Sequence, residues 1–164
     1  MTALLQNLKN MASPSGLRLL WNYLRAVPGG GLILGRILGR MAPYTGTIRP
    51  EVLQLEPGFA KTRMHDRPGL RNHLKSIHAI ALINLAEATT GLAMMYSMPD
   101  DSRGIPTNLS IEYVKKARGT ITAECSCAQI SSTEKREYEV VADLKNEAGE
   151  VVARATAKWM VGPS

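Results

Sequence analysis

Three side chains that could do chemistry lie in or just before one long apolar stretch of the sequence. Asn72 precedes this stretch, His78 stands at its start and Glu87 lies near its middle. A carboxylate in apolar surroundings can act as a general base or as a nucleophile, because burial raises its pKa. A buried carboxylate without a partner is also energetically unfavourable. Glu87 is therefore the residue on which a functional interpretation chiefly depends.

The apolar stretch has the periodicity of a helix. Apolar side chains recur every three or four residues along one face, namely Ile77, Ile80, Ala81, Leu85, Ala88, Leu92 and Met95. A second apolar set lies away from that face. We therefore predict one helix over about residues 76–96, with Ser76 as its candidate N-cap, that is buried on most sides.

Helix geometry limits how the reactive groups can act together. Nine residues at ~100° each place Glu87 about 180° round the helix from His78 and ~13 Å further along its axis. The two side chains therefore cannot meet in a pocket of one chain. If both serve one site, Glu87 comes from one subunit and His78, with Asn72, from its neighbour. Such an arrangement gives two symmetric sites in a dimer.

Alternation with a period of two predicts strands on both sides of this helix. Before it, residues 45–55 and 59–65 form a predicted hairpin, and residues 66–74 form a loop that carries Asn72. After it, four strands joined by short turns are predicted as an antiparallel meander, over residues 105–114, 119–130, 136–144 and 151–161. The expected fold class is α+β, an antiparallel sheet of about six strands wrapped around one long central helix.

Residues 1–44 form a predicted N-terminal helical extension to the main domain, residues 45–164. Two amphipathic helices are expected, within residues 13–28 and 32–41, although Gly35 and Gly39 lower the intrinsic stability of the second. We interpret them as helices packed on the edge or face of the main domain. Binding to a membrane surface is the less favoured alternative, because the apolar stripe is narrow and the positive charges are few.

The formal charge of +6 is unevenly distributed along the chain. Residues 1–41 carry five basic and no acidic residues, whereas the rest carries 15 basic and 14 acidic residues. A basic segment beside a balanced domain indicates a solvated helix face, which we favour, a docking arm or a membrane-surface helix. The near-neutral main domain and the aromatic content of only 5% argue against nucleic acid as a partner.

Composition and cysteine usage place further limits on function. A chain of 164 residues with 45% hydrophobic content is typical of one globular domain. No stretch reaches the ~18–20 uncharged residues that cross a bilayer, and no signal peptide is convincing. Cys125 and Cys127 point the same way on one predicted strand and have no His nearby, so they form neither a disulfide framework nor a good zinc site. We expect reduced thiols, no metal site, no separate cofactor and a cytoplasmic protein.

The order of elements and the spacing of the chemical groups resemble one known class of protein. The sequence is similar to hotdog-fold thioesterases of the phenylacetyl-CoA thioesterase type. These have an Asn in a loop, a His six residues later at the helix start, and an Asp or Glu nine residues after the His. Asn72, His78 and Glu87 have this spacing, and TyrValLysLysAlaArgGly at residues 113–119 is similar to the family's pattern after the helix. The resemblance covers about residues 45–161.

A few positions depart from that pattern. Ala79 and Ile80 replace two glycines that the family commonly has after the His, Lys75 replaces a glycine between the Asn and the His, and Lys116 stands where the family often has proline. Because glycine lets a backbone approach a ligand closely, the thioester carbonyl is expected to lie differently or to be held less well. A non-catalytic hotdog module that binds acyl-CoA or another acyl ligand is therefore the alternative interpretation.

The resemblance implies hydrolysis of an acyl-CoA thioester by a homodimer or a dimer of dimers, with coenzyme A as part of the substrate. Glu87 is the expected base or nucleophile, with Asn72 and His78 beside it in the site. The backbone N–H of Ala79, at the positive end of the helix dipole, is the expected oxyanion donor.

Six further residues are candidates for binding the substrate. Thr90 is expected to bond either the Glu87 carboxylate or its own helix, and Thr107 or Asn108 offers a polar contact on the next strand. The compact basic cluster Lys115, Lys116 and Arg118 could meet the phosphates of coenzyme A, or could be a solvated turn.

Overall fold

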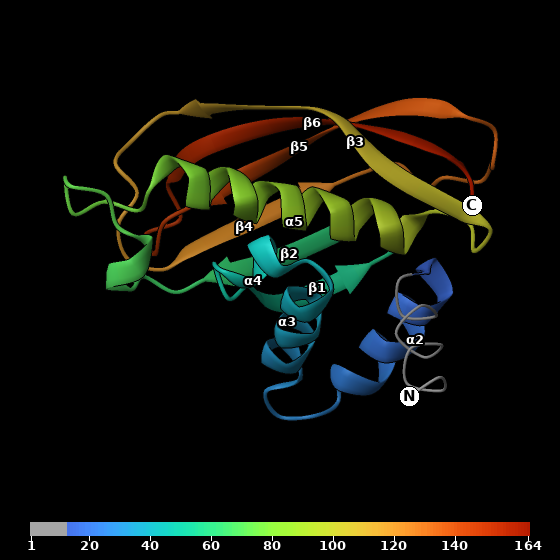
Figure 1. Cartoon of the computed structure of the whole chain (residues 1–164), viewed down its shortest axis with the longest axis horizontal. Coiled ribbons are helices and arrows are strands. Elements are labelled where there is room, and N and C mark those ends of the chain that lie inside the picture. The colour runs from blue at the N-terminus through green and yellow to red at the C-terminus, as the bar shows by residue number, and fades with distance from the viewer. Residues whose placement is uncertain (1–12) are drawn as a thin grey trace.

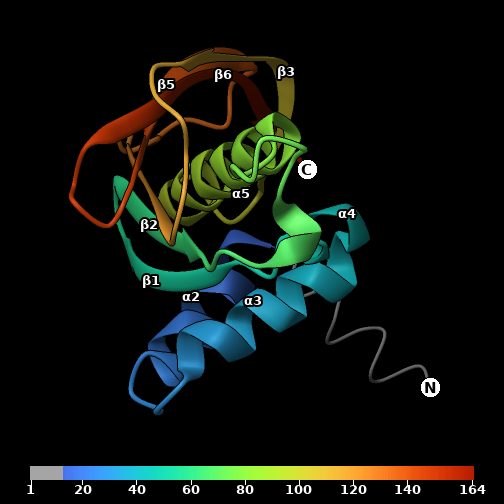
Figure 2. The same ribbon diagram turned by 90° about the vertical axis from the view of Figure 1, so that its left-hand side faces the viewer.

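The long helix α5, Ala79–Ser97, lies at the centre of the computed structural model, which describes residues 13–164 (Figure 1). One antiparallel sheet curls around it (Figure 2). The sheet has the strand order β1-β2-β4-β5-β6-β3. Its strands are β1 Glu51–Glu56, β2 Phe59–Met64, β3 Ser102–Tyr113, β4 Ile121–Ser126, β5 Arg136–Lys145 and β6 Val151–Pro163. This architecture is the hotdog fold, and the predicted fold class is confirmed.

The position of β3 differs from the predicted meander. β4, β5 and β6 are neighbours in the sheet, but β3 pairs with β6 at the far edge. The reason is the path of residues 114–120, which cross the N-terminal end of α5, where the N–H of Ile77 donates to the carbonyl of Ala117 at 2.8 Å. The chain therefore leaves β3 on one side of the helix and begins β4 on the other.

Several element boundaries also differ from the predicted ones. Residues 45–49 are not strand: Pro43–Gly46 form a short helix, α4, and β1 begins only at Glu51. A proline at the first helical position favours this turn, because its fixed φ suits a helix start. The central helix begins at Ala79 with His78 as its N-cap, later than Ser76, and β3 begins at Ser102. A 3₁₀ turn, η1 Pro68–Leu70, interrupts the loop that precedes the central helix.

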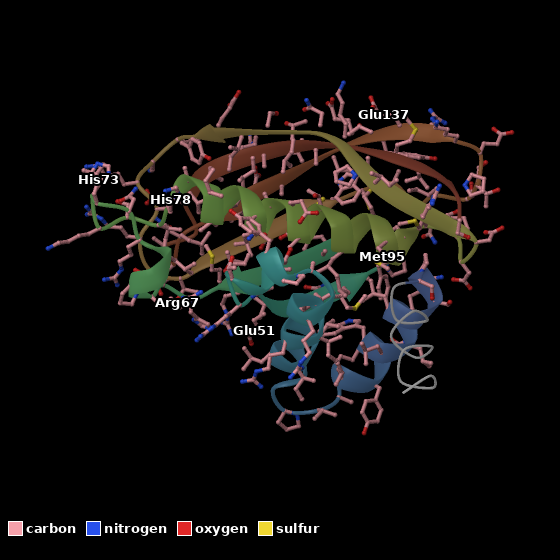
Figure 3. All side chains as sticks on the ribbon, in the orientation of Figure 1. Glu51, Arg67, His73, His78, Met95 and Glu137 are labelled. Atoms are coloured by element: carbon pink, nitrogen blue, oxygen red, sulfur yellow. The ribbon has the colours of Figure 1, made fainter. Side chains whose placement is uncertain are left out.

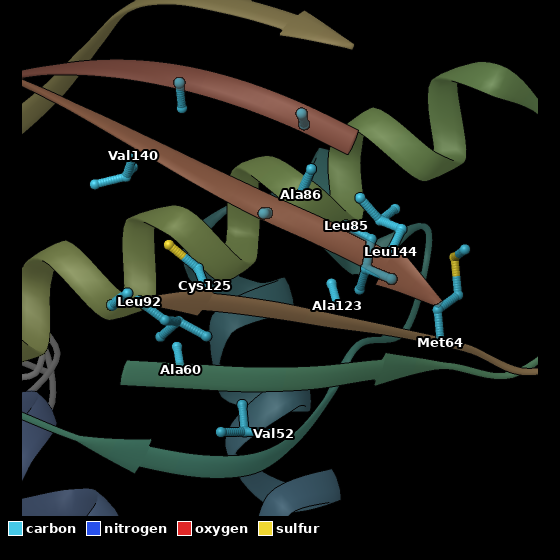
Figure 4. Packing of buried hydrophobic residues seen from close by; sticks show 14 of the residues in the cluster. Val52, Ala60, Met64, Leu85, Ala86, Leu92, Ala123, Cys125, Val140 and Leu144 are labelled. Carbon is cyan, nitrogen blue, oxygen red and sulfur yellow. The ribbon is translucent and has the colours of Figure 1, made fainter. Parts of the chain in front are cut away.

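The core lies between α5 and the concave face of the sheet (Figure 4). Alternating residues of β4, β5 and β6 face the helix and are fully or almost fully buried, among them Ala123, Cys125, Val140, Ala142, Leu144, Ala153, Ala155 and Ala157. Leu85, Ala86 and Ala93 face them from α5 and are fully buried. By length and composition α5 could cross a membrane, but the sheet encloses most of its surface. The prediction of a largely buried central helix is confirmed.

Two N-terminal helices, α2 Pro14–Leu24 and α3 Gly30–Met41, pack against the hotdog domain. The apolar stripe of α2 is buried, and the indole N–H of Trp21 donates to the carbonyl of Leu55 in β1 at 3.1 Å. Helix α3 lies against β1, which is one edge of the sheet. Both helices of the extension therefore pack on the domain, α3 at its β1 edge.

Glycines make the contact between α3 and β1 possible. A Cβ atom on Gly31 would lie 2.0 Å from the carbonyl oxygen of Val52, and one on Gly35 would lie 1.7 Å from that of Pro50. No real Cβ tolerates such distances, so only glycine lets the helix approach the strand backbone this closely. The glycines that weaken α3 as an isolated helix therefore fix it against the sheet.

Gly35→Ala is expected to lower the free energy of unfolding by about 1–3 kcal/mol, because the new methyl group must push α3 away from the Pro50 carbonyl. Urea unfolding followed by circular dichroism measures the change. Gly162→Ala is the control, since its Cβ would meet its nearest neighbours at an ordinary 3.6 Å. Equal stability of the two variants would contradict this account of the packing.

Candidate active site

Glu87 lies in the wall of an apolar cleft of about 370 Å³ between α5, the N-terminal helices and the start of β3. The apolar lining includes Leu38, Met41, Met95 and Trp159. The Glu87 carboxylate forms no hydrogen bond or salt bridge with any residue in the described range 13–164. Burial raises the pKa of this carboxyl above its ordinary value. The arrangement keeps a potential base next to a pocket that could hold an acyl chain.

The backbone around Glu87 is held by a short chain of hydrogen bonds. The Thr90 hydroxyl donates to the main-chain carbonyl of Glu87 at 3.0 Å, and the indole N–H of Trp159 donates to the Thr90 hydroxyl at 3.3 Å. Of the two roles considered for Thr90, the structure therefore shows the bond back to its own helix. Trp159 also lies against Gly91, where a Cβ would be 3.0 Å from the indole ring. These contacts fix the side of α5 that Glu87 occupies.

His78 and Asn72 lie at the other end of α5, and Figure 3 shows His78 and Met95 near opposite ends of this helix. The Nδ1 atom of His78 accepts the N–H of Ile80 at 3.1 Å, so His78 caps the helix with its side chain. With Nδ1 as the acceptor, the ring proton is on Nε2 in the neutral form. His78 is exposed and lines a small polar opening together with Arg67 and Asn84.

The side chain of Asn72 organises its own loop. Its Oδ1 accepts the N–H groups of Leu74 at 2.9 Å and Ser76 at 3.2 Å. Lys75, between them, has φ +56°, in the left-handed region that glycine adopts most easily. Lys75 stands where the resembled family has a glycine. The backbone here therefore keeps a conformation that favours glycine, although the residue is a lysine.

The N-terminus of α5 offers an unpaired donor. Within the described residues, the N–H of Ala79 has no acceptor, and Ala79 lines an opening of about 320 Å³ together with Asn72. Tyr113 lines the same opening, and its hydroxyl donates to the Ala79 carbonyl at 3.1 Å. Partial burial raises the pKa of the Tyr113 phenol. The sequence patterns did not identify Tyr113 as a site residue, because only the topology brings the end of β3 to the helix start.

The remaining candidate residues lie on the surface around these openings. The ammonium group of Lys115 is 2.7 Å from Glu150, whereas Lys116 and Arg118 are exposed and have no partner within residues 13–164. On β3, the Thr107 hydroxyl donates to Glu137 at 3.0 Å, and Asn108 is exposed beside a break in the strand register.

A single chain therefore does not bring the predicted site residues together. Asn72, Ala79, Lys115 and Lys116 share one opening, His78 lines another, and Glu87 lines the apolar cleft. Among residues 13–164 no group of three or more His, Cys, Asp or Glu side chains could hold a metal ion. The two cysteines are free thiols, and burial, with a smaller effect of Cys127, raises the pKa of Cys125 to about 12.

Comparison with known proteins places the chain in a structural class. A crystal structure of a genomics target is similar over 90% of this chain and 97% of its own, with a TM-score of 0.76 and 29% sequence identity. A Pseudomonas aeruginosa protein described as a "Probable Thioesterase" is similar over 80% and 95%, with a TM-score of 0.72 and 27% identity. A thioesterase family protein from Silicibacter pomeroyi shares the fold at 16% identity, over 79% and 96%, with a TM-score of 0.68.

The fold and these neighbours define a hotdog-fold protein of the thioesterase superfamily. More particularly, a family model described as a domain of unknown function (DUF4442) matches residues 30–161, and the chain belongs to that family. No curated protein matches the sequence at a significant level. The family match begins at the first residue of α3.

Glu87→Gln is expected to change how stability depends on pH. Since the folded pKa is raised above the ordinary 4.5, the unfolded chain loses this proton first as pH rises, and the wild type then loses stability. The variant lacks this loss, so the difference in free energy of unfolding between the two proteins should shift in favour of the variant as pH rises above 4.5. Urea titrations from pH 4 to 8 at one protein concentration measure the difference. Parallel curves for the two proteins would show that Glu87 is not desolvated.

Proposed function

We propose that this protein hydrolyses acyl-CoA thioesters, with Glu87 as the general base or nucleophile. The observation that carries the proposal is the partly buried, unpaired carboxylate of Glu87 beside an apolar cleft, on the central helix of a thioesterase fold. A solvated surface carboxylate would be too weak a base, whereas desolvation makes Glu87 a better proton acceptor. The P. aeruginosa neighbour described as a "Probable Thioesterase" supports the reaction class.

The chemistry needs few groups. As a base, Glu87 takes a proton from a water molecule that attacks the thioester carbonyl carbon. The resulting oxyanion accepts a hydrogen bond from the free N–H of Ala79 at the positive end of α5. The C–S bond then breaks, and the proton that Glu87 took passes to the sulfur, which releases coenzyme A as the thiol. As a nucleophile, Glu87 attacks the carbonyl carbon, and the C–S bond breaks to release coenzyme A as the thiolate. Water then hydrolyses the mixed anhydride to the free acid and the Glu87 carboxylate.

Edge strand β3 supports a composite site between two subunits. The edge of β1 is covered by α3, but in the described part of the chain β3 pairs only with β6 and its other edge is open. Open edges of this length readily pair with another strand. The exposed fractions of Ile105 and Tyr113 on β3 are 54% and 49%. We therefore assign this edge to a second copy of the chain.

Antiparallel pairing of β3 with its copy would complete the site. The start of β3, at Arg103 and Gly104, lines the Glu87 cleft, and its end, at Tyr113, lines the opening of Asn72 and Ala79. A two-fold axis places the start of one strand beside the end of the other. The Glu87 cleft of one subunit then faces the Ala79 N–H of its neighbour. A dimer of dimers is compatible with the same pairing.

Substrate contacts follow from this arrangement. Thr107 and Asn108 stand midway along β3, so they would lie near the two-fold axis, where the Asn108 side chain has no hydrogen bond within residues 13–164. Lys116 and Arg118 are the unpaired members of the basic cluster and are the better partners for phosphate groups of coenzyme A. Lys115, paired with Glu150, would first have to leave that carboxylate.

A binding module without catalysis is the second candidate function. It is favoured by the helix start, where Asn72 already accepts two backbone N–H groups and Lys75 and Ala79 stand in place of glycines. Such a module would hold an acyl-CoA in the same cleft without turnover.

Glu87→Ala is expected to reduce kcat for acyl-CoA hydrolysis at least about 100-fold, because the group that activates or attacks is removed. Release of free thiol from a panel of acyl-CoA substrates measures the rate. Glu134→Ala is the control, an exposed glutamate whose carboxylate has no partner within residues 13–164. No turnover by the wild type would favour the binding module, and unchanged turnover by Glu87→Ala would refute the catalytic role.

Mixed dimers test whether the site is composite. Asn72→Asp keeps the acceptor for the loop but loses the amide N–H donor, and Glu87→Gln loses the carboxylate. Each variant alone should be inactive. When they are unfolded together and refolded, about half the dimers should be mixed, each with one intact site, which restores about a quarter of wild-type activity. No restoration in dimers shown to be mixed would place Glu87 and Asn72 in one subunit's site.

A further inference from the structure

A second cleft lies away from Glu87, between α3, α4 and the segment that follows β2. Its volume is about 830 Å³, within the range of small-molecule sites. It shares Thr47, Ile48 and Arg67 with the opening that His78 lines, but it has no residue in common with the Glu87 cleft. The proposed reaction uses none of the residues that are particular to it.

Four arginines line this cleft, and no acidic residue does. They are Arg36 and Arg40 on α3, Arg49 before β1, and Arg67 after β2. Within residues 13–164 none of the four forms a salt bridge, whereas Arg18, Arg63, Arg71 and Arg154 each have a carboxylate partner. His65 also lines the cleft.

The acidic group at the margin of the cleft does not neutralise this charge. Glu51 lies at the margin and accepts two hydrogen bonds from Arg63, at 2.8 and 2.9 Å, while His65 lies 3.3 Å from the same oxygen. Its carboxylate is thus already paired outside the four arginines. Figure 3 shows Arg67 and Glu51 on this side of the molecule. The four guanidinium groups therefore repel one another without a counter-charge from the described residues.

The cleft is held by the fold rather than by the side chains alone. Gly35 and Gly39 let α3 approach the backbone at Pro50 and Gly46, and the one-turn spacing of Arg36 and Arg40 puts both on the same side of α3. Arg49 is kept in the left-handed region at φ +50°. An arginine rarely adopts this conformation, so the surrounding structure imposes it.

Arg67 carries a donor that the described residues leave unsatisfied. One of its terminal nitrogens donates to the carbonyl of Thr47, which fixes the guanidinium group, but its Nε is buried without any acceptor. A buried donor without a partner is unfavourable, and a bound oxyanion would satisfy it.

From these observations we infer that the cleft formed by Arg36, Arg40, Arg49 and Arg67 binds a phosphate-bearing ligand. The guanidinium fork matches the oxygens of a phosphate group and forms paired charge-assisted hydrogen bonds with it. A nucleotide phosphate and a phospholipid headgroup present this same chemistry. The inference does not depend on thioester hydrolysis, and a binding measurement tests it without turnover.

Calorimetric titration of the full chain tests the inference with pyrophosphate, adenosine 3′,5′-bisphosphate and, as the phosphate-free control, adenosine. Sedimentation with phosphatidylcholine vesicles, with and without phosphatidylglycerol, tests the headgroup. Arg36→Gln combined with Arg40→Gln removes two charges from the cleft, and exposed Arg25→Gln combined with Lys135→Gln removes two elsewhere. Arg49→Gly removes a third cleft charge and suits the backbone at φ +50°.

We expect the double cleft variant and Arg49→Gly to weaken binding at least about tenfold, with the control double variant close to wild type. Binding of the soluble phosphates identifies a nucleotide as the source, and binding of phosphatidylglycerol vesicles alone identifies a headgroup. Either result supports the inference. No binding of any phosphate probe, equal losses in the cleft and control variants, or equal affinity for adenosine would overturn it.

Discussion

The close approach of α5 to the inner face of the sheet is the constraint on which the rest of the structure depends. Alanines on both surfaces make it possible, with Ala86 and Ala93 on the helix facing Ala123, Ala142, Ala153, Ala155 and Ala157 on the strands. Because interiors pack to high density, this contact fixes the rotation of the helix about its axis. The side that remains, with Ile80, Glu87, Gly91 and Met95, is only partly covered. The position of the carboxylate is thus a consequence of how the other sides of α5 pack.

The two edges of the sheet differ, because small residues let a helix cover one of them. On α3 the absence of Cβ atoms at Gly31 and Gly35 lets a helix cover β1 and removes that edge. The same packing brings Leu38 and Met41 to the Glu87 cleft, so the extension contributes to the site as well as to the fold. No comparable element covers β3 within residues 13–164. The subunit interface proposed above can therefore form only along β3.

The sequence predicted what local periodicity controls and missed what tertiary contacts control. The helix around Glu87 and the strands β4, β5 and β6 follow from spacing alone. The position of β3 in the sheet does not follow from spacing, because alternation shows which residues face inward but not which strand is the neighbour. The glycines of α3 were interpreted as weak points, since their benefit exists only in contact with β1.

The candidate site shows the same division. The spacing of His78 and Glu87 predicted that the two side chains cannot meet in one chain, and they line separate openings. Asn72 was expected beside His78, but it lines a third opening. The hydrogen bond from Tyr113 to Ala79 could not be predicted, because it joins residues 34 positions apart. The sequence also could not show that Lys75, which replaces a glycine, keeps a left-handed φ.

The uneven charge of the chain has a structural meaning that composition alone does not give. Residues 1–50 contain six basic and no acidic residues, so the whole net charge of +6 arises there. Arg18 is used within the fold, where it pairs with Asp100 and donates to the carbonyls of Tyr96 and Met98 at the end of α5. Arg36, Arg40 and Arg49 instead meet in one cleft. Like-charged side chains that are merely solvated are not expected to lie close together, because separation lowers their repulsion. The folding of α3 onto β1 thus turns a diffuse basic segment into a concentrated positive site.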